Sequence, residues 1–447
     1  MIKKAVLFTS LASNSGKTLI TSSIANILRS KDYKVTPFKC GPDYIDTSIL
    51  GKATNCNAYN LDTILTSSNT LKDIFFEKLS YSDIAIVEGV MGFLDGISKD
   101  FKGSTFEIAK LLQLPTVFIL DAKASAQSII IPIKGIEWIK KYIPVIGIIL
   151  NNVSTEGHKK LLIEAITKHS KINILGVLPK YGKEIFFSRH LGLQTAIELD
   201  KNIFNDLSAF VEQNINIDKI LALAKIDINY SFVKKENRKK KTTKKIGYIA
   251  YDKAFNFYYR SNIEYLMELG YNIKYFSPLE NETIEKCDFL YIGGGYPELY
   301  AKRLQDNTNT IDSIIEHFHR GGKIIAECGG LIYLSKSITN DNTTYNMINI
   351  FDTNFKMENK IQALGYVEAE INKNLPFYEK GKKIKGHIFH YSSIISNNEE
   401  YIFKLKTLST NKIIYDGFFK NATLASYTHF HFLDESSLIE KFLQWRC

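Results

Sequence analysis

The fold of this chain is decided by Ile325-Ala326-Glu327-Cys328-Gly329-Gly330-Leu331. The apolar run before Cys328 predicts a buried strand, and the two glycines allow a sharp turn into an apolar segment that we expect to be helical. A reactive side chain between a strand and a helix N-terminus is typical of a nucleophile elbow. The helix end would supply partial positive charge and free N–H groups, which favour a thiolate and an oxyanion. The alternative is a small buried cysteine beside a glycine turn.

A glycine-rich turn upstream supports a catalytic role for Cys328. The apolar strand expected at residues 289–292 ends in Gly293-Gly294-Gly295-Tyr296-Pro297-Glu298. The glycines of this turn could present backbone N–H groups to an oxyanion formed on Cys328. We therefore predict Gly294, Gly295 and the elbow residue Gly329 as oxyanion donors.

Two histidines near the end of the sequence are the predicted partners of Cys328. His429 and His431 lie in Ser426-Tyr427-Thr428-His429-Phe430-His431-Phe432 and would share one face of a strand. Their spacing could also suit a metal, but a metal site needs further clustered ligands. A catalytic base with a second, orienting histidine is therefore favoured. Two other histidines, His387 and His390, are assigned no chemistry.

An earlier stretch, Ser10-Leu11-Ala12-Ser13-Asn14-Ser15-Gly16-Lys17-Thr18, predicts a phosphate loop between a strand and a helix. Gly16 would let the backbone approach phosphate, and Lys17 would reach the terminal phosphates. The Thr18 hydroxyl would bind Mg²⁺, and the N-terminus of the following helix would add its dipole. This context predicts nucleotide binding.

Acidic turns follow two further apolar strands. One strand runs into Cys40-Gly41-Pro42-Asp43-Tyr44-Ile45-Asp46, and another ends in Glu88. Ligands bind past the carboxyl ends of strands in parallel sheets, and an acid beside a phosphate loop usually holds Mg²⁺ directly or through water. Each acid alone could instead form a turn or cap a helix. Their convergence on one sheet edge favours a metal and substrate site.

Apolar runs alternate with helical stretches in the first half, which predicts a parallel sheet covered on both faces. A basic run at residues 234–245 marks a boundary, after which a second sheet with helices begins. Beyond Ser335 the pattern alternates and is typical of antiparallel strands. We predict an α/β protein with domains at residues 1–230 and 246–447, joined by a basic linker at residues 231–245. The strands expected in the first half are residues 4–9, 34–39, 83–87, 116–121, 145–152 and 175–179, with a helix over residues 19–30.

The composition is that of a globular chain of 447 residues. No apolar run approaches the roughly 18–20 residues that span a bilayer, so no membrane partner is expected. Five scattered cysteines without a CxxC pair argue against a zinc site or disulfide framework and favour a reducing cytoplasm. Much of the net charge of +10 lies in the basic run. That run lacks interleaved aromatic residues, so we expect a solvated linker and no nucleic-acid partner.

Several stretches occur together in an order that is specific to one family. They are Lys39-Cys40-Gly41-Pro42-Asp43-Tyr44-Ile45-Asp46, Glu88-Gly89-Val90-Met91-Gly92, Arg189-His190-Leu191-Gly192-Leu193, Asp252-Lys253-Ala254-Phe255-Asn256-Phe257-Tyr258-Tyr259, Gly294-Gly295-Tyr296-Pro297-Glu298, Cys328-Gly329-Gly330 and Gly386-His387-Ile388-Phe389-His390-Tyr391. From about residue 4 to residue 432, the chain resembles the cobyrinic acid a,c-diamide synthase family.

The resemblance implies an N-terminal phosphate-loop domain like that of dethiobiotin synthetase and a C-terminal class I glutamine amidotransferase domain. Members of the family convert the a- and c-carboxylates of a corrinoid to amides, in cobalamin biosynthesis. Glutamine and cobyrinic acid are therefore the expected substrates, and ATP and Mg²⁺ the expected cofactors. ATP would form an acyl phosphate, and ammonia released from glutamine at Cys328 would displace the phosphate. His429 occupies the place of the family's base, and His431 lies where many glutamine amidotransferases carry an orienting acid, although the two roles could be swapped.

The resemblance also assigns residues of the first domain, with Asn151 at the adenine. The implied sets are Ser15, Gly16, Lys17, Thr18, Asp95 and Asn151 for the nucleotide, Lys39, Asp43, Tyr44 and Asp46 for the substrate, and Thr18, Asp46 and Glu88 for Mg²⁺. Two departures stand out. The strict phosphate-loop pattern has glycine at the position that Leu11 occupies in this chain. Relatives often carry an acid where this chain has Ile388.

Two other functions remain open at this point. A sister enzyme could amidate another tetrapyrrole, either hydrogenobyrinic acid or nickel sirohydrochlorin. A non-enzymatic phosphate-loop switch of the partitioning type could use the basic run to bind DNA, but it would leave Cys328 and the histidines unexplained. We expect a monomer or a homodimer.

Overall fold

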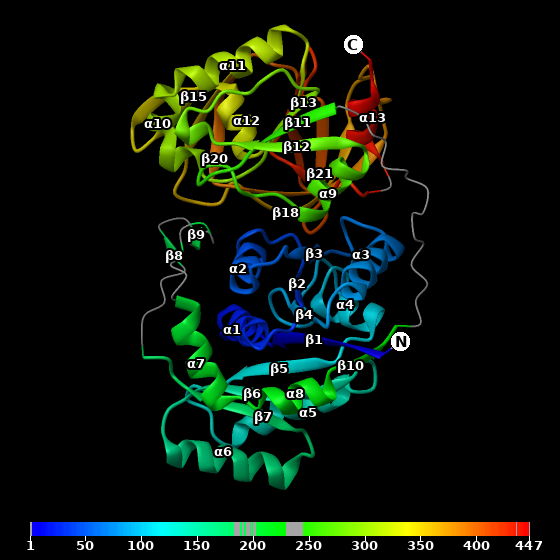
Figure 1. Ribbon diagram of the computed structural model, residues 1–447, viewed down its shortest axis with the longest axis vertical. Coiled ribbons are helices and arrows are strands. Elements are labelled where there is room, and N and C mark those ends of the chain that lie inside the picture. Colours follow the sequence, from blue (N-terminus) through cyan, green and yellow to red (C-terminus); the bar gives the residue numbers. More distant parts are fainter. Residues whose placement is uncertain are drawn as a thin grey trace. The chain divides into compact units, whose positions relative to one another are not determined.

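The computed structural model describes residues 2–182, 188–189, 192–193, 197, 199, 203–228, 245–434 and 436–446. The chain forms two compact units, residues 1–63 with 68–234 and residues 64–67 with 235–447 (Figure 1). The predicted linker lies outside the described residues except for Lys245, as do His190 and Leu191 of one family stretch. The predicted domain limits therefore stay predictions.

The first unit is built on a sheet with the strand order β3-β2-β4-β1-β5-β6-β7. Neighbours along this order pair in parallel, whereas β10 pairs with the start of β1 in the antiparallel direction. The expected strands are all present, and the short strands β3 and β10 are additional. The strands are β1 (Ile2–Ser10), β2 (Val35–Cys40), β3 (Tyr59–Leu61), β4 (Ile84–Glu88), β5 (Thr116–Asp121), β6 (Val145–Val153), β7 (Ile174–Pro179) and β10 (Lys225–Asp227), with β8 (Ser188–Arg189) and β9 (Gly192–Leu193) as a separate pair.

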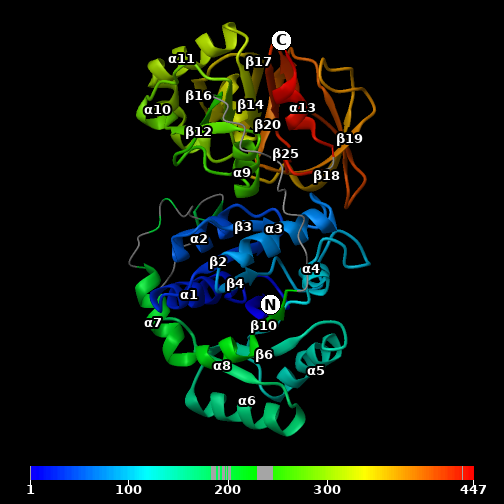
Figure 2. The same ribbon diagram turned by 45° about the vertical axis from the view of Figure 1, so that its right-hand side comes forward.

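Helices cover both faces of this sheet, and Figure 2 shows α1 and α7 on the opposite side from α4 and α5. The connection from β1 to β2 and that from β4 to β5 run in opposite directions across the sheet. The direction of the connections therefore reverses between β1 and β4, and parallel sheets bind ligands past the carboxyl ends of their strands at such a reversal. The helices are α1 (Lys17–Ser30), α2 (Ile45–Thr54), α3 (Ser68–Ser80), α4 (Thr105–Leu112), α5 (Ile130–Ile139), α6 (Glu156–His169), α7 (Ile203–Asn214) and α8 (Ile217–Leu223).

The helix α1 illustrates why these segments fold as they do. Its apolar residues Ile20, Ile24 and Ile27 recur at helical spacing and are almost completely buried. They pack in one apolar core with Val6 and Phe8 of β1. This packing fixes the start of α1, and with it the phosphate loop, on the strand that precedes it.

The second unit contains a sheet with the order β12-β11-β13-β14-β24-β23, in which only β23 and β24 pair antiparallel. Short helices follow its strands, and β14 is flanked by β13 and β24. This confirms the predicted second α/β domain. The elements of this part are β11 (Lys245–Ala250), α9 (Arg260–Glu268), β12 (Tyr271–Phe276), β13 (Phe289–Ile292), α10 (Ala301–Asp306), α11 (Thr308–His319), β14 (Lys323–Glu327), α12 (Gly329–Leu334), β23 (Phe418–Lys420), β24 (Thr423–Ser426) and α13 (Leu438–Gln444).

The region beyond Ser335 forms two further sheets, with orders β16-β15-β17-β20 and β22-β21-β18-β19-β25. All their pairs are antiparallel except β15 with β17. The expected antiparallel pattern is thus confirmed with one parallel exception. The strands are β15 (Ser335–Asn340), β16 (Thr343–Asn346), β17 (Phe351–Met357), β18 (Ala363–Ile371), β19 (Lys383–His390), β20 (Ser392–Asn397), β21 (Phe403–Thr407), β22 (Ile413–Asp416) and β25 (His429–Phe430). No helix in the described part of the chain has the length and apolar character that a bilayer span requires.

Candidate active sites

The phosphate loop is held by its own side chains and by β6. Gly16 adopts φ +89°, and a Cβ at this position would lie 2.4 Å from Nδ2 of Asn151. That amide nitrogen donates to the Ser15 carbonyl at 3.1 Å, and the Ser15 hydroxyl donates to Ala12 O at 2.9 Å. Glycine is therefore required at Gly16 both by the left-handed backbone and by the approach of Asn151. In this structure Asn151 supports the loop itself.

Lys17 curls back onto the loop. Its Nζ donates to the Ser10 hydroxyl at 2.8 Å and to Ala12 O at 3.0 Å. Burial and the neighbouring Lys39 ammonium lower the pKa of Lys17 to about 8. An incoming phosphate would offer this ammonium stronger acceptors than a hydroxyl and a carbonyl.

Lys39 stands at the centre of a buried charge cluster at the carboxyl ends of β2 and β4. Its Nζ donates to Asp46 Oδ2 at 2.6 Å and to Glu88 Oε1 at 2.7 Å. The Thr18 hydroxyl donates to the same Glu88 oxygen at 2.7 Å. The three predicted Mg²⁺ ligands, Thr18, Asp46 and Glu88, therefore lie in one hydrogen-bonded cluster with the Lys39 ammonium.

The ionisation of this cluster follows from its burial and its pairing. Burial opposes the charged form of Lys39, but Asp46 and Glu88 outweigh it and raise the pKa of Lys39. Burial alone would raise the pKa of Asp46, whereas the Lys39 ammonium lowers it below its ordinary value. Burial raises the pKa of Glu88 despite the same ammonium. The Lys39 ammonium therefore compensates the negative charge of Glu88 less fully than that of Asp46.

Asp43 lies beside the cluster at the start of α2. Its Oδ1 accepts the Asp46 backbone N–H at 2.9 Å. Burial and the negative charge of Asp46 raise the pKa of Asp43 to about 7. Tyr44 is the residue before α2, and Asp95 Oδ2 accepts the Gly92 N–H at 3.0 Å in the turn after β4. The predicted substrate residues therefore share one strand end, and Asp95 shapes the neighbouring turn.

The cluster has the character of a cation site. Glu88 Oε2 is buried and has no hydrogen-bond partner among the described residues. Such an acceptor is costly to bury unless a cation or donor reaches it. Groups of three or more His, Cys, Asp or Glu side chains placed to hold a metal are absent from the described residues. Any metal at Glu88 would therefore need the Thr18 hydroxyl or non-protein ligands as well.

The elbow at Cys328 has the backbone of a strained turn. Cys328 adopts φ 51° and ψ −103° between β14 and α12, and its N–H donates to Ser426 O at 2.7 Å. A positive φ is costly for a residue with a Cβ and persists where the surroundings enforce it. The thiol lies 3.7 Å from Phe389 O. The structure thus places Cys328 at the predicted strand-to-helix turn.

His429 is the predicted histidine that contacts Cys328. Burial opposes a charged ring, but contacts with Cys328 and the Glu327 carboxylate outweigh it and raise the pKa of His429 to about 10. The Nδ1 of His429 lies 3.6 Å from Glu327 Oε2, which is an ion-pair distance rather than a hydrogen-bond distance. An imidazolium beside a thiol favours the thiolate.

His431 occupies a different environment. It lies just beyond β25 and its ring packs against Tyr259, with centroids 5.4 Å apart. Burial lowers the pKa of His431 to about 4, and its Nδ1 has no hydrogen-bond partner among the described residues. The predicted orienting role of His431 stays a prediction. The acid beside His429 is Glu327, for which the sequence pattern predicted no role.

The predicted oxyanion glycines lie around the same two side chains. A Cβ at Gly294 would lie 2.6 Å from Cε1 of His429, so only glycine permits this approach. A Cβ at Gly329 would lie 3.2 Å from the Gly295 nitrogen. The backbones of Gly295 and Gly329 therefore meet beside the elbow. Gly329 opens α12, where N–H groups have no acceptor within the helix.

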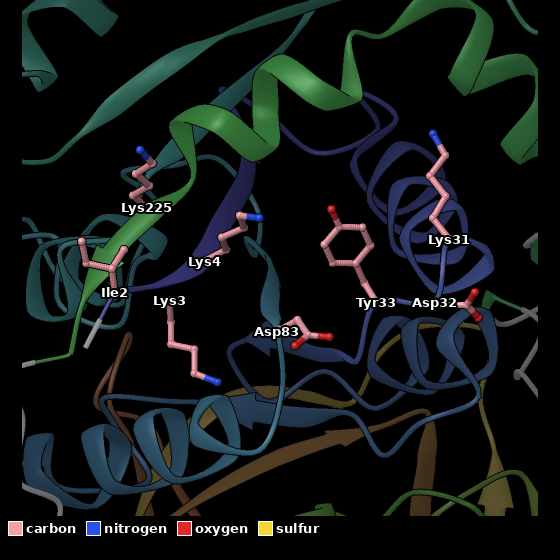
Figure 3. A pocket seen from close by; sticks show the side chains of 8 residues that line it. All are labelled: Ile2, Lys3, Lys4, Lys31, Asp32, Tyr33, Asp83 and Lys225. Carbon is pink, nitrogen blue, oxygen red and sulfur yellow. The ribbon is translucent and has the colours of Figure 1, made fainter.

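A separate basic pocket lies at the amino end of β1 (Figure 3). Lys3 Nζ donates to Ser82 O at 2.7 Å, and Lys31 pairs with Glu212 at 2.7 Å. The phosphate loop follows the other end of the same strand. This pocket therefore belongs to neither candidate site. Its lining residues are Ile2, Lys3, Lys4, Lys31, Asp32, Tyr33, Asp83 and Lys225.

Two family models match the chain, one for each half. Residues 6–183 match the CobQ/CobB/MinD/ParA nucleotide binding domain. Residues 246–437 match the CobB/CobQ-like glutamine amidotransferase domain. These two ranges contain the phosphate loop and the cysteine elbow, respectively.

Curated relatives match along nearly the whole length. A protein of Caldanaerobacter subterraneus subsp. tengcongensis named cobyrinate a,c-diamide synthase is 40% identical over 443 residues, covering 97% of this chain and 96% of the relative. Proteins of the same name from Listeria innocua and Saccharolobus solfataricus are 34% and 37% identical, covering 97% and 96% of this chain and 97% and 98% of theirs.

Proposed function

Because this chain belongs to the cobyrinate a,c-diamide synthase family, we propose that it amidates the a- and c-carboxylates of cobyrinic acid in cobalamin biosynthesis, with glutamine as nitrogen donor. The predicted family, fold class and enzyme class are confirmed by the relatives and by the two matching domains. The observation that carries the proposal is that one chain holds both a phosphate loop and a cysteine elbow with its histidine. A phosphate-loop switch would need only the first.

Activation of the substrate is assigned to the first site. A carboxylate is a poor electrophile, so ATP would convert it to an acyl phosphate that ammonia then attacks. Lys17 would neutralise charge on the transferred phosphoryl group, and the amides at Ser15 and Gly16 would hold phosphate. Asp95 and Asn151 complete the proposed nucleotide site.

Mg²⁺ is the proposed metal of this site. Thr18, Asp46 and Glu88 offer the hydroxyl and carboxylate oxygens that it prefers, and buried Glu88 Oε2 is available as an acceptor. When bound, Mg²⁺ would offset negative charge on the phosphates. Lys39, Asp43, Tyr44 and Asp46 are proposed to receive the substrate carboxylate. In the present structure the Lys39 ammonium bridges Asp46 and Glu88, so these two carboxylates already bind positive charge together.

Release of ammonia is assigned to the second site. The Cys328 thiolate attacks the glutamine amide carbon, and the oxyanion is received by N–H groups of Gly294, Gly295 and Gly329. His429 then donates a proton to the departing ammonia, and water hydrolyses the thioester. The contact between His429 and Cys328 and the positive charge on the ring support these roles.

We propose a cytoplasmic enzyme that acts as a monomer or homodimer and has no nucleic-acid or membrane partner. Hydrogenobyrinic acid and nickel sirohydrochlorin are the alternative tetrapyrrole substrates. Their carboxylates present the same chemistry, so the residues around Asp46 do not discriminate among them.

A product analysis tests the proposal. The purified full chain is incubated with ATP, Mg²⁺, glutamine and each tetrapyrrole acid in turn. The products are identified by their masses in mass spectrometry. We expect a diamide of cobyrinic acid and one glutamate released per amide. If another tetrapyrrole acid is diamidated in preference to cobyrinic acid, the protein has the sister activity. If none of the tetrapyrrole acids is amidated, the proposal is overturned.

A further inference from the structure

The described acid nearest to the proposed base comes from an unexpected place in the chain. Glu327 is the last residue of β14 and directly precedes the nucleophile, whereas the sequence pattern pointed to His431. Its side chain is almost fully buried, and so is that of His429, at 3% exposure each. A carboxylate in such surroundings needs partners that compensate its charge.

Those partners fix the position of the carboxylate. The Tyr291 hydroxyl of β13 donates to Glu327 Oε2 at 2.6 Å, and the Phe430 N–H of β25 donates to Oε1 at 3.0 Å. The segment after His429 is fixed in turn by buried Asn262 of α9, which donates to Phe430 O and accepts from Phe432 N–H, each at 2.8 Å. The acid at the end of β14 and the histidine at the start of β25 are therefore linked through the Phe430 N–H, which limits their freedom to separate.

We propose that Glu327 is the positioning residue of the glutaminase site, which orients His429 and stabilises its imidazolium by charge. Glu327 Oε2 faces the Nδ1 side of the ring, which leaves Nε2 as the nitrogen available for the Cys328 thiol and the departing ammonia. The acid, the nucleophile and the proposed oxyanion donor Gly329 are thus consecutive residues of one strand-to-helix turn. This inference rests on the proposed function of Cys328 and His429.

Other titratable groups face His429 from the strands packed around it. Cys328 contacts the ring of His429, and the positive charge of that ring acts on His387 and His390 of β19. Burial, together with the charge of His429, lowers the pKa of His387 to about 3, and burial lowers the pKa of His390 as well. Tyr291 and Tyr258 lie near Glu327, and burial raises the pKa of both. These two histidines and two tyrosines stay neutral near pH 7, so the negative charges that balance the imidazolium are those of Glu327 and of the proposed Cys328 thiolate.

The test compares the parent enzyme with Glu327→Gln, Glu327→Asp and Glu440→Gln in glutamine hydrolysis with ATP, Mg²⁺ and cobyrinic acid present. Glu440 accepts a hydrogen bond from Tyr265 elsewhere in this unit, so Glu440→Gln breaks a matched tyrosine–carboxylate pair outside the site. For Glu327→Gln we expect kcat to fall by about a hundredfold or more, with KM for glutamine within about threefold. The alkaline limb of the pH profile should move to lower pH, because the imidazolium loses its counter-charge. Amidation with ammonium salts should persist.

The conservative variant keeps the charge but shortens the side chain. Glu327→Asp should show an intermediate kcat with an alkaline limb between those of the parent and Glu327→Gln, and Glu440→Gln should match the parent. A pH limb unchanged in Glu327→Gln, or a fall in kcat equal to that of Glu440→Gln, would overturn the positioning role. If Glu327→Gln is insoluble, the test rests on Glu327→Asp. A Glu327→Asp variant whose kcat and pH profile equal those of the parent would overturn the positioning role. Absence of glutamine hydrolysis in the parent would instead refute the proposed function, and this inference with it.

Discussion

Lys39 and Cys328 both lie at carboxyl ends of strands in parallel sheets, but the two are held by different means. Lys39 is fixed by opposite charges, with Asp46 and Glu88 as its partners. Cys328 is fixed by its backbone, which is forced into φ 51° by the strand and helix on either side. A charge cluster can exchange one cation for another, whereas a strained turn holds one side chain in one position. The first site is therefore suited to receive ions and substrates, and the second to repeat one chemical step.

The largest effect is expected where both nitrogen donors depend on one residue. Lys17→Ala should lower amidation by roughly 10⁴, because phosphoryl transfer relies on positive charge around the phosphates. The loss should be the same with glutamine and with ammonium salts, as measured by product formation. Substantial activity with ammonia would break the assignment of activation to the first site.

Cys328→Ser should separate the two sites most clearly. A serine hydroxyl is scarcely ionised near neutral pH, so glutamine-dependent amidation should fall about a thousandfold or more. Ammonium salts at mildly alkaline pH should restore product. A folded variant that fails with ammonia as well would mean that Cys328 acts in activation, and the two sites would no longer perform separate steps.

Glu88→Gln probes whether the charge cluster serves catalysis or packing. The variant leaves Asp46 as a partner for Lys39, so only a modest fall in Tm is expected. Turnover should fall on the order of a hundredfold, because an oxygen that would face Mg²⁺ loses its charge. Parental specific activity in a protein that melts earlier would return Glu88 to a structural role.

The smallest effect is a change of stability with pH. The pKa of Asp43 is raised to about 7, so its stabilising contribution is present below the unfolded value of about 3.9 and is lost as pH rises through 7. Asp43→Asn should therefore gain Tm relative to the parent between pH 5 and pH 8, by a few degrees. Asp46, whose pKa is lowered, should show the opposite trend in Asp46→Asn: that variant should lose Tm relative to the parent as pH rises toward the unfolded value of about 3.9. A constant difference between Asp43→Asn and the parent across this range would contradict the raised pKa.

The fold was largely predictable because its signals are local. Apolar runs such as residues 116–121 and 289–292 coincide with β5 and β13, since a strand buried on both faces has to be apolar throughout. The short strand β10 was missed because it pairs with Ile2–Lys4 of β1, far away in sequence. Three residues carry too little pattern to indicate a strand whose partner is unknown.

The sites were predictable in their residue types but not in their pairings. Lys39, Glu88 and Asp46 were each selected, yet nothing local indicates that one ammonium bridges both acids. Glu327 was passed over because its partners, Tyr291 and Phe430, come from other strands. An acid that ends an otherwise apolar strand, directly before a candidate nucleophile, was the available signal.

The pairing of β14 with β24 can form only after both strands have been synthesised, so β14 lacks this partner for part of translation. The strand that carries the nucleophile aligns Glu327 with Ser426, which leaves the ribosome about a hundred residues later. At about 5–20 residues per second, that edge of β14 waits about 5–20 s for its partner. During this interval Cys328 lacks its contact with His429. The unpaired edge of β14 is also exposed and can pair with strands of other chains. We expect nascent chains arrested before Thr423 to need chaperone protection that the finished protein does not.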